Sequence, residues 1–79
     1  KGFVDFIFYP KRIDMPGIIL ELKIDHTPQE AIEQIKEKNY QLRFQGKIGE
    51  YPVYDGSILA VGISYDRKTK KHNCEVETL

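Results

Sequence analysis

The sequence predicts an α/β domain with a mixed sheet and one principal helix, in the order strand-strand-helix-strand-strand. Two short apolar runs precede a helix-start signal at Thr27, and two further runs follow it. A short polar connection between the first two strands favours an antiparallel hairpin. A helix between the second and third strands indicates a right-handed crossover, which pairs those two strands in parallel.

Four segments have the composition of strands. Residues 3–9 are aromatic and β-branched, and Pro10 ends them. Residues 18–24 are apolar except for two charges, which is typical of a central strand covered on both faces. Residues 57–65 are again apolar on both faces, and residues 73–77 alternate as an edge strand after a basic turn over 66–71.

The helix begins with the clearest local signal in the chain. Thr27 is a suitable N-cap, Pro28 falls at the first helical position, and Glu30 can complete a capping box. An apolar stripe follows at helical spacing, and the pattern predicts that the helix fades near Phe44, before a long loop over 46–56. The stripe consists of Ala31, Ile32, Ile35 and Leu42.

Length and composition limit the possible classes of protein. The 79 residues suffice for one domain, and twelve basic residues balance twelve acidic ones, which argues against a dedicated DNA-coating protein. Cys74 is the one cysteine, so an internal disulfide and a cysteine-rich zinc site are excluded. A single thiol suits a reducing compartment, and we expect a cytoplasmic location. No apolar run approaches the ~20 residues of a membrane span.

Three charged residues interrupt the first two strands. Glu21 and Lys23 are two positions apart, so both side chains project from one face of the second strand. Charges in an apolar strand are costly unless they meet partners or a metal. In a hairpin, Asp5 can lie beside Glu21, and a divalent cation would remove the repulsion between the two carboxylates. Oxygen ligands alone indicate Mg²⁺ or Mn²⁺.

These residues carry a resemblance to a known family. The segments Gly2-Phe3-Val4-Asp5 and Leu20-Glu21-Leu22-Lys23 resemble the D…ExK signature of the PD-(D/E)xK nuclease superfamily, whose core is restriction-endonuclease-like. The match continues through the helix and third strand and is similar to the nuclease-like domain at the C-terminal end of bacterial AAA-ATPase-like proteins. That continuation consists of Ala31, Gln34-Ile35, Tyr40 and Val61-Gly62-Ile63-Ser64-Tyr65.

The resemblance implies a role for each site residue. Asp5 and Glu21 would ligate the metal, with the backbone carbonyl of Leu22 as a further ligand. Lys23 would orient the attacking water and offset charge on the phosphate, and Gln34 would orient Lys23 or the substrate. The implied activity is Mg²⁺-dependent phosphodiester hydrolysis of nucleic acid, with DNA expected, and the implied partner is a parent ATPase-like domain.

The chain departs from the family in two places. Many relatives carry an acidic residue on a helix before the first strand, so we expect this chain to be an excised fragment lacking that helix. One face of the sheet should then lack cover, and the fragment should form a homodimer or expose an apolar patch. In some relatives a tyrosine follows the helix glutamine by four positions, whereas that position is Lys38 and the tyrosine is Tyr40.

Simpler interpretations remain open for each feature. Asp5, Glu21 and Lys23 could form a structural ion pair between strands, and Gln34 could be solvated. A catalytically silent module that binds nucleic acid or docks on its ATPase-like neighbour is the alternative function. His26 and His72 are expected at the surface, and Tyr51 and Tyr54 are expected to cover the core, with stacking on bases as the alternative. The basic turn of Arg67, Lys68, Lys70 and Lys71 is expected to be a solvated tip, with contact to phosphates as the alternative.

Overall fold

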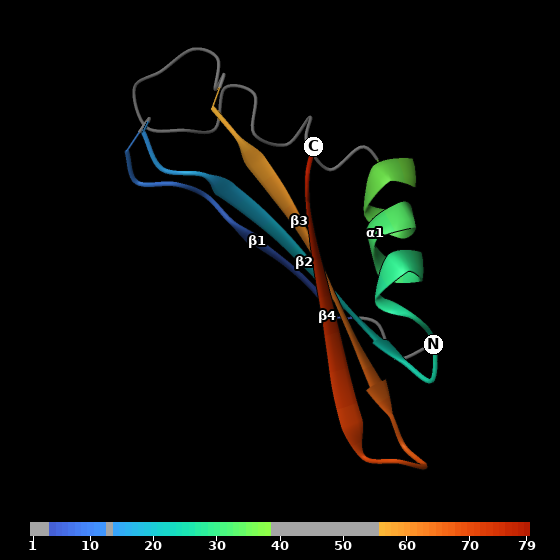
Figure 1. The fold of residues 1–79 in the computed structure, drawn as a ribbon. Coiled ribbons are helices and arrows are strands. Elements are labelled where there is room, and N and C mark those ends of the chain that lie inside the picture. Colours follow the sequence, from blue (N-terminus) through green and yellow to red (C-terminus); the bar gives the residue numbers. More distant parts are fainter. Residues whose placement is uncertain (1–3, 13, 39–55) are drawn as a thin grey trace.

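The structure is a computed structural model that describes residues 4–12, 14–38 and 56–79, with side chains except those of Val4 and Asp5. Within these ranges it is a small α/β domain with a four-stranded mixed sheet and one helix, so the predicted class and element order are confirmed (Figure 1). The elements are β1 (Val4–Phe8), β2 (Gly17–Ile24), α1 (Pro28–Glu37), β3 (Ile58–Asp66) and β4 (Lys71–Thr78).

The strands lie in the spatial order β1-β2-β3-β4. β1 and β2 pair antiparallel and β2 and β3 pair parallel, as predicted, and β3 and β4 pair antiparallel. β4 is longer than expected because its pairing with β3 continues without interruption to the Asp66–Lys71 pair beside the turn. The predicted loop over 46–56, with Tyr51 and Tyr54, lies largely outside the described residues.

The helix start is confirmed and its predicted end is wrong. The Thr27 hydroxyl accepts a hydrogen bond from the Glu30 backbone N–H at 3.1 Å, and a Glu30 carboxylate oxygen accepts one from the Thr27 backbone N–H at 2.9 Å. α1 ends at Glu37, with Lys38 as its C-cap. The buried stripe stops at Ile35, because the positions one turn further carry polar residues. Leu42 and Phe44 lie outside the described ranges.

We expect Thr27→Ala to lower the free energy of unfolding by about 1 kcal/mol, since it removes one half of the capping box. Chemical denaturation of the variant measures the loss. Thr27→Ser keeps the hydroxyl and serves as the matched control, with a stability close to that of the unchanged protein. Equal stability of the alanine and serine variants would show that the capping box contributes nothing.

One face of the sheet packs against α1. Every second residue of β2 from Gly17 to Lys23 is buried, as are Ala60, Gly62 and Ser64 of β3. At Gly62 the helix approaches so closely that an added Cβ would lie 2.3 Å from the Pro28 carbonyl oxygen. The core is made by Ile19, Ile32, Ile35 and Ala60, with Ile7 and Ile58 packed against it.

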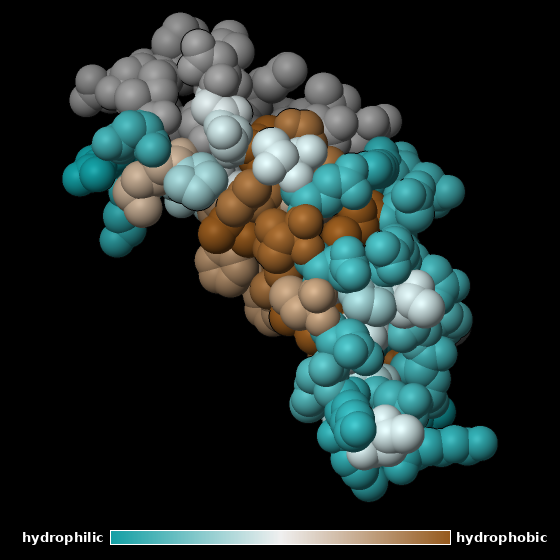
Figure 2. Space-filling view, in the orientation of Figure 1, coloured by the Kyte–Doolittle hydropathy of each residue, from teal (hydrophilic) through white to brown (hydrophobic). Residues whose placement is uncertain are grey.

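The opposite face of the sheet is apolar, and no other described element covers it. Its positions in β2 to β4 hold no aspartate, glutamate, lysine or arginine. Phe6 and Phe8 are 48% and 51% exposed and stack on each other, and Val76 is 58% exposed. Figure 2 shows hydrophobic residues gathered over the strands, away from the hydrophilic outer surface of α1.

This surface should bind an apolar dye or a second copy of the chain. We expect 8-anilinonaphthalene-1-sulfonate fluorescence to rise with the folded protein, or sedimentation to report a concentration-dependent dimer. Phe6→Ser combined with Phe8→Ser should weaken either signal because it removes the exposed aromatic pair. A compact monomer that binds no dye would contradict the expectation.

Candidate functional site

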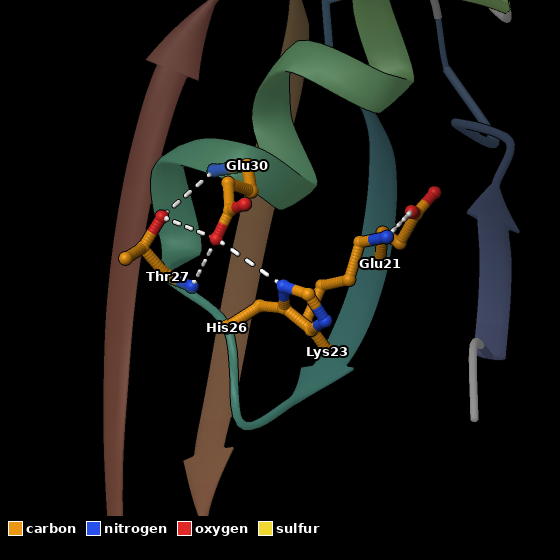
Figure 3. Close-up of polar contacts among 5 residues, drawn as sticks. All are labelled: Glu21, Lys23, His26, Thr27 and Glu30. Carbon is orange, nitrogen blue, oxygen red and sulfur yellow. Dashed lines mark hydrogen bonds and ion pairs between the residues drawn. The ribbon is translucent and has the colours of Figure 1, made fainter. Parts of the chain in front are cut away.

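Glu21 and Lys23 lie on the face of β2 that α1 covers. Their neighbours along the strand are apolar and point to the opposite face. Glu21 is fully buried and Lys23 is 8% exposed. The Lys23 ammonium nitrogen lies 3.9 Å from a Glu21 carboxylate oxygen, so the two charges attract at a distance longer than a hydrogen bond (Figure 3). The predicted shared face is therefore confirmed, and both charged groups are largely removed from water.

The hairpin places Asp5 directly opposite Glu21 in the β1–β2 register. Directly opposite residues of an antiparallel pair share one face of the sheet, so this register meets the requirement of a two-carboxylate site. The structure describes the backbone of Asp5 and not its side chain. The predicted approach of the two carboxylates is thus supported by the strand register alone.

Leu22 and Gln34 occupy different positions relative to this pair. Leu22 lies in the middle of β2, between Val4 of β1 and Ile63 of β3. Gln34 is half-buried in α1, one residue before buried Ile35. The predicted orienting role of Gln34 stays a prediction.

Sequence reasoning missed Ser64 as a neighbour of the site. Ser64 is 3% exposed and lies directly opposite Lys23 in the parallel β2–β3 register. Neighbouring strands are about 4.8 Å apart, so its hydroxyl belongs to the immediate surroundings of the Lys23 stem. The small residues at every second position, Ala60, Gly62 and Ser64, were a signal that this face of β3 receives a helix.

The two histidines lie at the surface, as expected. His26 is half-exposed and its Nδ1 lies 3.4 Å from a Glu30 carboxylate oxygen (Figure 3). That carboxylate is also held by the Thr27 backbone N–H, which lowers the pKa of Glu30 below its usual range. His72 is exposed, and its ring lies tilted against that of Tyr65 with ring centroids 4.7 Å apart.

The donor set fits a hard cation better than a zinc ion. Among the described side chains, no group of three histidine, cysteine, aspartate or glutamate residues could hold a metal. The candidate set instead combines the buried Glu21 carboxylate with Asp5, whose side chain is not among the described ones. Carboxylate and carbonyl oxygens suit Mg²⁺ or Mn²⁺. A cation held there would also offset the cost of burying the Glu21 charge.

The end of β2 is tied to the β3–β4 turn. Asp25 has a positive φ of 61°, a conformation that aspartate tolerates better than most residues. Its carboxylate accepts hydrogen bonds from the Arg67 backbone N–H at 3.0 Å and from Arg67 Nε at 2.7 Å. These contacts hold the pKa of Asp25 below its usual range.

The lowered pKa of Asp25 predicts the sign of a pH effect on stability. Its stabilisation is present above the usual carboxyl range and is lost as the pH falls through the lowered pKa. We therefore expect Asp25→Asn to lower the melting temperature at neutral pH, and the difference from the unchanged protein to shrink in acid. Melting curves over a pH series measure it. A difference that stays constant into strong acid would contradict the assignment.

Comparisons with known proteins find no matching family model, no similar curated protein and no similar solved structure. No helix in the described part of the chain is long and apolar enough to cross a membrane.

Proposed function

We propose that this domain hydrolyses phosphodiester bonds of nucleic acid in a metal-dependent reaction, with DNA as the expected substrate. The observation that carries the proposal is the β1–β2 register, which pairs Asp5 with Glu21, while Lys23 follows on the same face of β2. Two acidic positions and one ammonium group on adjacent strands are a suitable set for metal-assisted attack on a phosphate.

Each residue would have one task in this reaction. Asp5 and Glu21 would hold the cation, together with the backbone carbonyl of Leu22. The cation, Mg²⁺ or Mn²⁺, would lower the pKa of bound water and offset charge developing at phosphorus. Lys23 would hold the attacking water and a phosphate oxygen by hydrogen bonds, and Gln34 would orient Lys23 or the substrate from α1.

The resemblance to the PD-(D/E)xK superfamily is the second support for this proposal. It adds the expectation of a restriction-endonuclease-like core and of a neighbouring ATPase-like domain in the same polypeptide. The strand pairing and the capped helix after β2 are compatible with such a core. A fold of this kind hosts active and inactive members, so function depends on the site residues.

Burial of the site favours a second candidate, a catalytically silent module that binds nucleic acid or docks on its ATPase-like neighbour. Glu21 is fully buried beside Lys23, and an ion pair closed in this way can be purely structural. In the silent module the pair would hold β2 in place and would need no metal.

Cleavage of fluorescently labelled single-stranded and duplex DNA in Mg²⁺, in Mn²⁺ and in EDTA separates the two candidates. We expect metal-dependent products from the unchanged chain and none from Glu21→Gln. Glu33→Gln, at an exposed position on α1, is the matched control and should keep full activity. Cleavage that survives Glu21→Gln, or its absence from folded, metal-loaded protein, would count against hydrolysis.

A further inference from the structure

Four cations lie at the turn between β3 and β4, three in the turn and one at the start of β4. We call Arg67, Lys68, Lys70 and Lys71 the basic tip, and all four are exposed. The last β3–β4 pair before the turn is Asp66 with Lys71. The last β2–β3 pair is Ile24 with Tyr65, so the turn extends beyond the end of β2. Figure 1 shows the hairpin projecting past the start of α1. The tip is therefore open to a large partner.

The two acidic residues nearest the tip are already occupied. An Asp66 carboxylate oxygen accepts hydrogen bonds from the backbone N–H groups of Lys68 and Thr69, at 2.8 Å and 3.2 Å. Asp25 binds Arg67 through its guanidinium and backbone. Within the described ranges, the ammonium groups of Lys68, Lys70 and Lys71 form no ion pair. Asp25 and Asp66 therefore hold the conformation of the turn, and the charges of Lys68, Lys70 and Lys71 face solvent.

Lys70 occupies a backbone position that does not favour lysine. Its φ is 62°, in the left-handed region where glycine and asparagine are preferred. Its backbone N–H donates a hydrogen bond to the Asp66 carbonyl at 2.7 Å, which holds it there. A strained position that carries a long cationic side chain favours a role for that side chain over a purely local one.

The tip and the candidate site share one side of the sheet. Lys23 is opposite Ser64, Ser64 is opposite Asn73, and Lys71 is the next residue of β4 on that face. With strands ~4.8 Å apart and same-face residues ~6.6 Å apart, Lys71 lies roughly 12 Å from Lys23. One strand of duplex DNA carries a phosphate at every nucleotide, so an interval of this length places the tip within a few nucleotides of the phosphate held at Lys23.

We propose that the basic tip binds the backbone phosphates of the nucleic acid on one side of the phosphate held at Lys23. This inference rests on the proposed function for the identity of the substrate. It adds the direction in which the bound nucleic-acid strand leaves the candidate site. Lys68, Lys70 and Lys71 each neutralise one phosphate, so the contact is independent of base sequence and sensitive to salt. The tip sets the position of the strand and takes no part in hydrolysis.

Fluorescence anisotropy of a labelled DNA duplex, titrated in EDTA at several salt concentrations, tests the proposal without requiring cleavage. Replacing Lys68, Lys70 and Lys71 together with glutamine should raise the Kd at least about tenfold at low salt. It should also flatten the slope of log K against log salt by ~2.7, about 0.9 for each phosphate contact. The matched control removes three charges elsewhere, at Lys11, Arg12 and Lys38, and should change the slope much less.

Lys70→Asn adds a readout that a structural role would not give. Asparagine suits the left-handed conformation, so the melting temperature should rise while DNA binding weakens. Absence of salt-dependent binding by the unchanged chain, or equal binding by the triple tip variant, would overturn the inference. Tip-dependent binding without cleavage would leave the tip assignment standing and remove the nuclease. Cleavage together with DNA binding that does not depend on the tip would leave the nuclease proposal standing and overturn the tip assignment.

Discussion

Lys23→Met is expected to lower the free energy of unfolding by about 3 kcal/mol in EDTA, and Mn²⁺ should restore most of that loss. The substitution keeps the length of the side chain and removes the cation beside fully buried Glu21. Breaking a buried ion pair by removing one of its partners typically costs about 3–5 kcal/mol. A metal bound by Asp5 and Glu21 supplies positive charge in place of the lysine and stabilises the folded state by mass action. Denaturant titrations with and without Mn²⁺ measure both effects.

Glu21→Gln combined with Lys23→Met is the control for this experiment. With both charges removed, the destabilisation in EDTA should be smaller than for Lys23→Met alone, and Mn²⁺ should have no effect. If Lys23→Met is unfolded in EDTA, refolding on addition of Mn²⁺ gives the same information. A destabilised variant that Mn²⁺ does not rescue would indicate a structural ion pair and contradict the metal site.

Gly62→Ala should destabilise the domain by about 2–3 kcal/mol, because the helix packs directly against the glycine. An added Cβ would lie 2.3 Å from the Pro28 carbonyl oxygen and 3.1 Å from both Ala31 Cβ and Ile32 Cγ1. The first contact is with backbone, so α1 has to move away from β3. Thermal unfolding by circular dichroism measures the loss, which for a domain of this size is a fall of many degrees.

Cys74→Ala, at an exposed position on β4, is the control and should leave the melting temperature nearly unchanged. The movement of α1 also has a consequence for the site, since Gln34 is carried by the same helix. A Gly62→Ala protein with unchanged stability would show that the helix does not approach β3 as closely as described.

The fold class was predictable because each element carries a local signal. The capping box at Thr27 and Glu30 defines the helix start through neighbouring residues alone, and the structure reproduces both of its hydrogen bonds. A helix between two apolar strands fixes their parallel pairing through chain connectivity. The helix end was not predictable in this way: α1 ends at Glu37 with Lys38 as its C-cap, where the sequence carries no strong stop signal, and Leu42 lies outside the described residues.

The candidate site was predictable in its strand positions and not in its surroundings. The spacing of Glu21 and Lys23 gives a shared face for any strand, and the hairpin register then brings Asp5 opposite Glu21. How deeply Glu21 and Lys23 are buried depends on which face of the sheet the helix covers. The small residues at alternate positions of β3 determine that face, and they carry no motif that points to a site. Ser64 was therefore recognised as part of the third strand, but its place opposite Lys23 was not predicted.

Calorimetric titration of Mn²⁺ into the protein, with Asp5→Ala and Glu21→Ala in parallel, tests the central claim most directly. Binding by the unchanged chain that disappears in both variants, with both still folded by circular dichroism, is the predicted result. It would show that a cation is held between the two residues that face each other across β1 and β2. Folded protein that binds no Mn²⁺, or variants that bind it as well as the unchanged chain, would contradict the metal site and leave the ion pair as a structural feature.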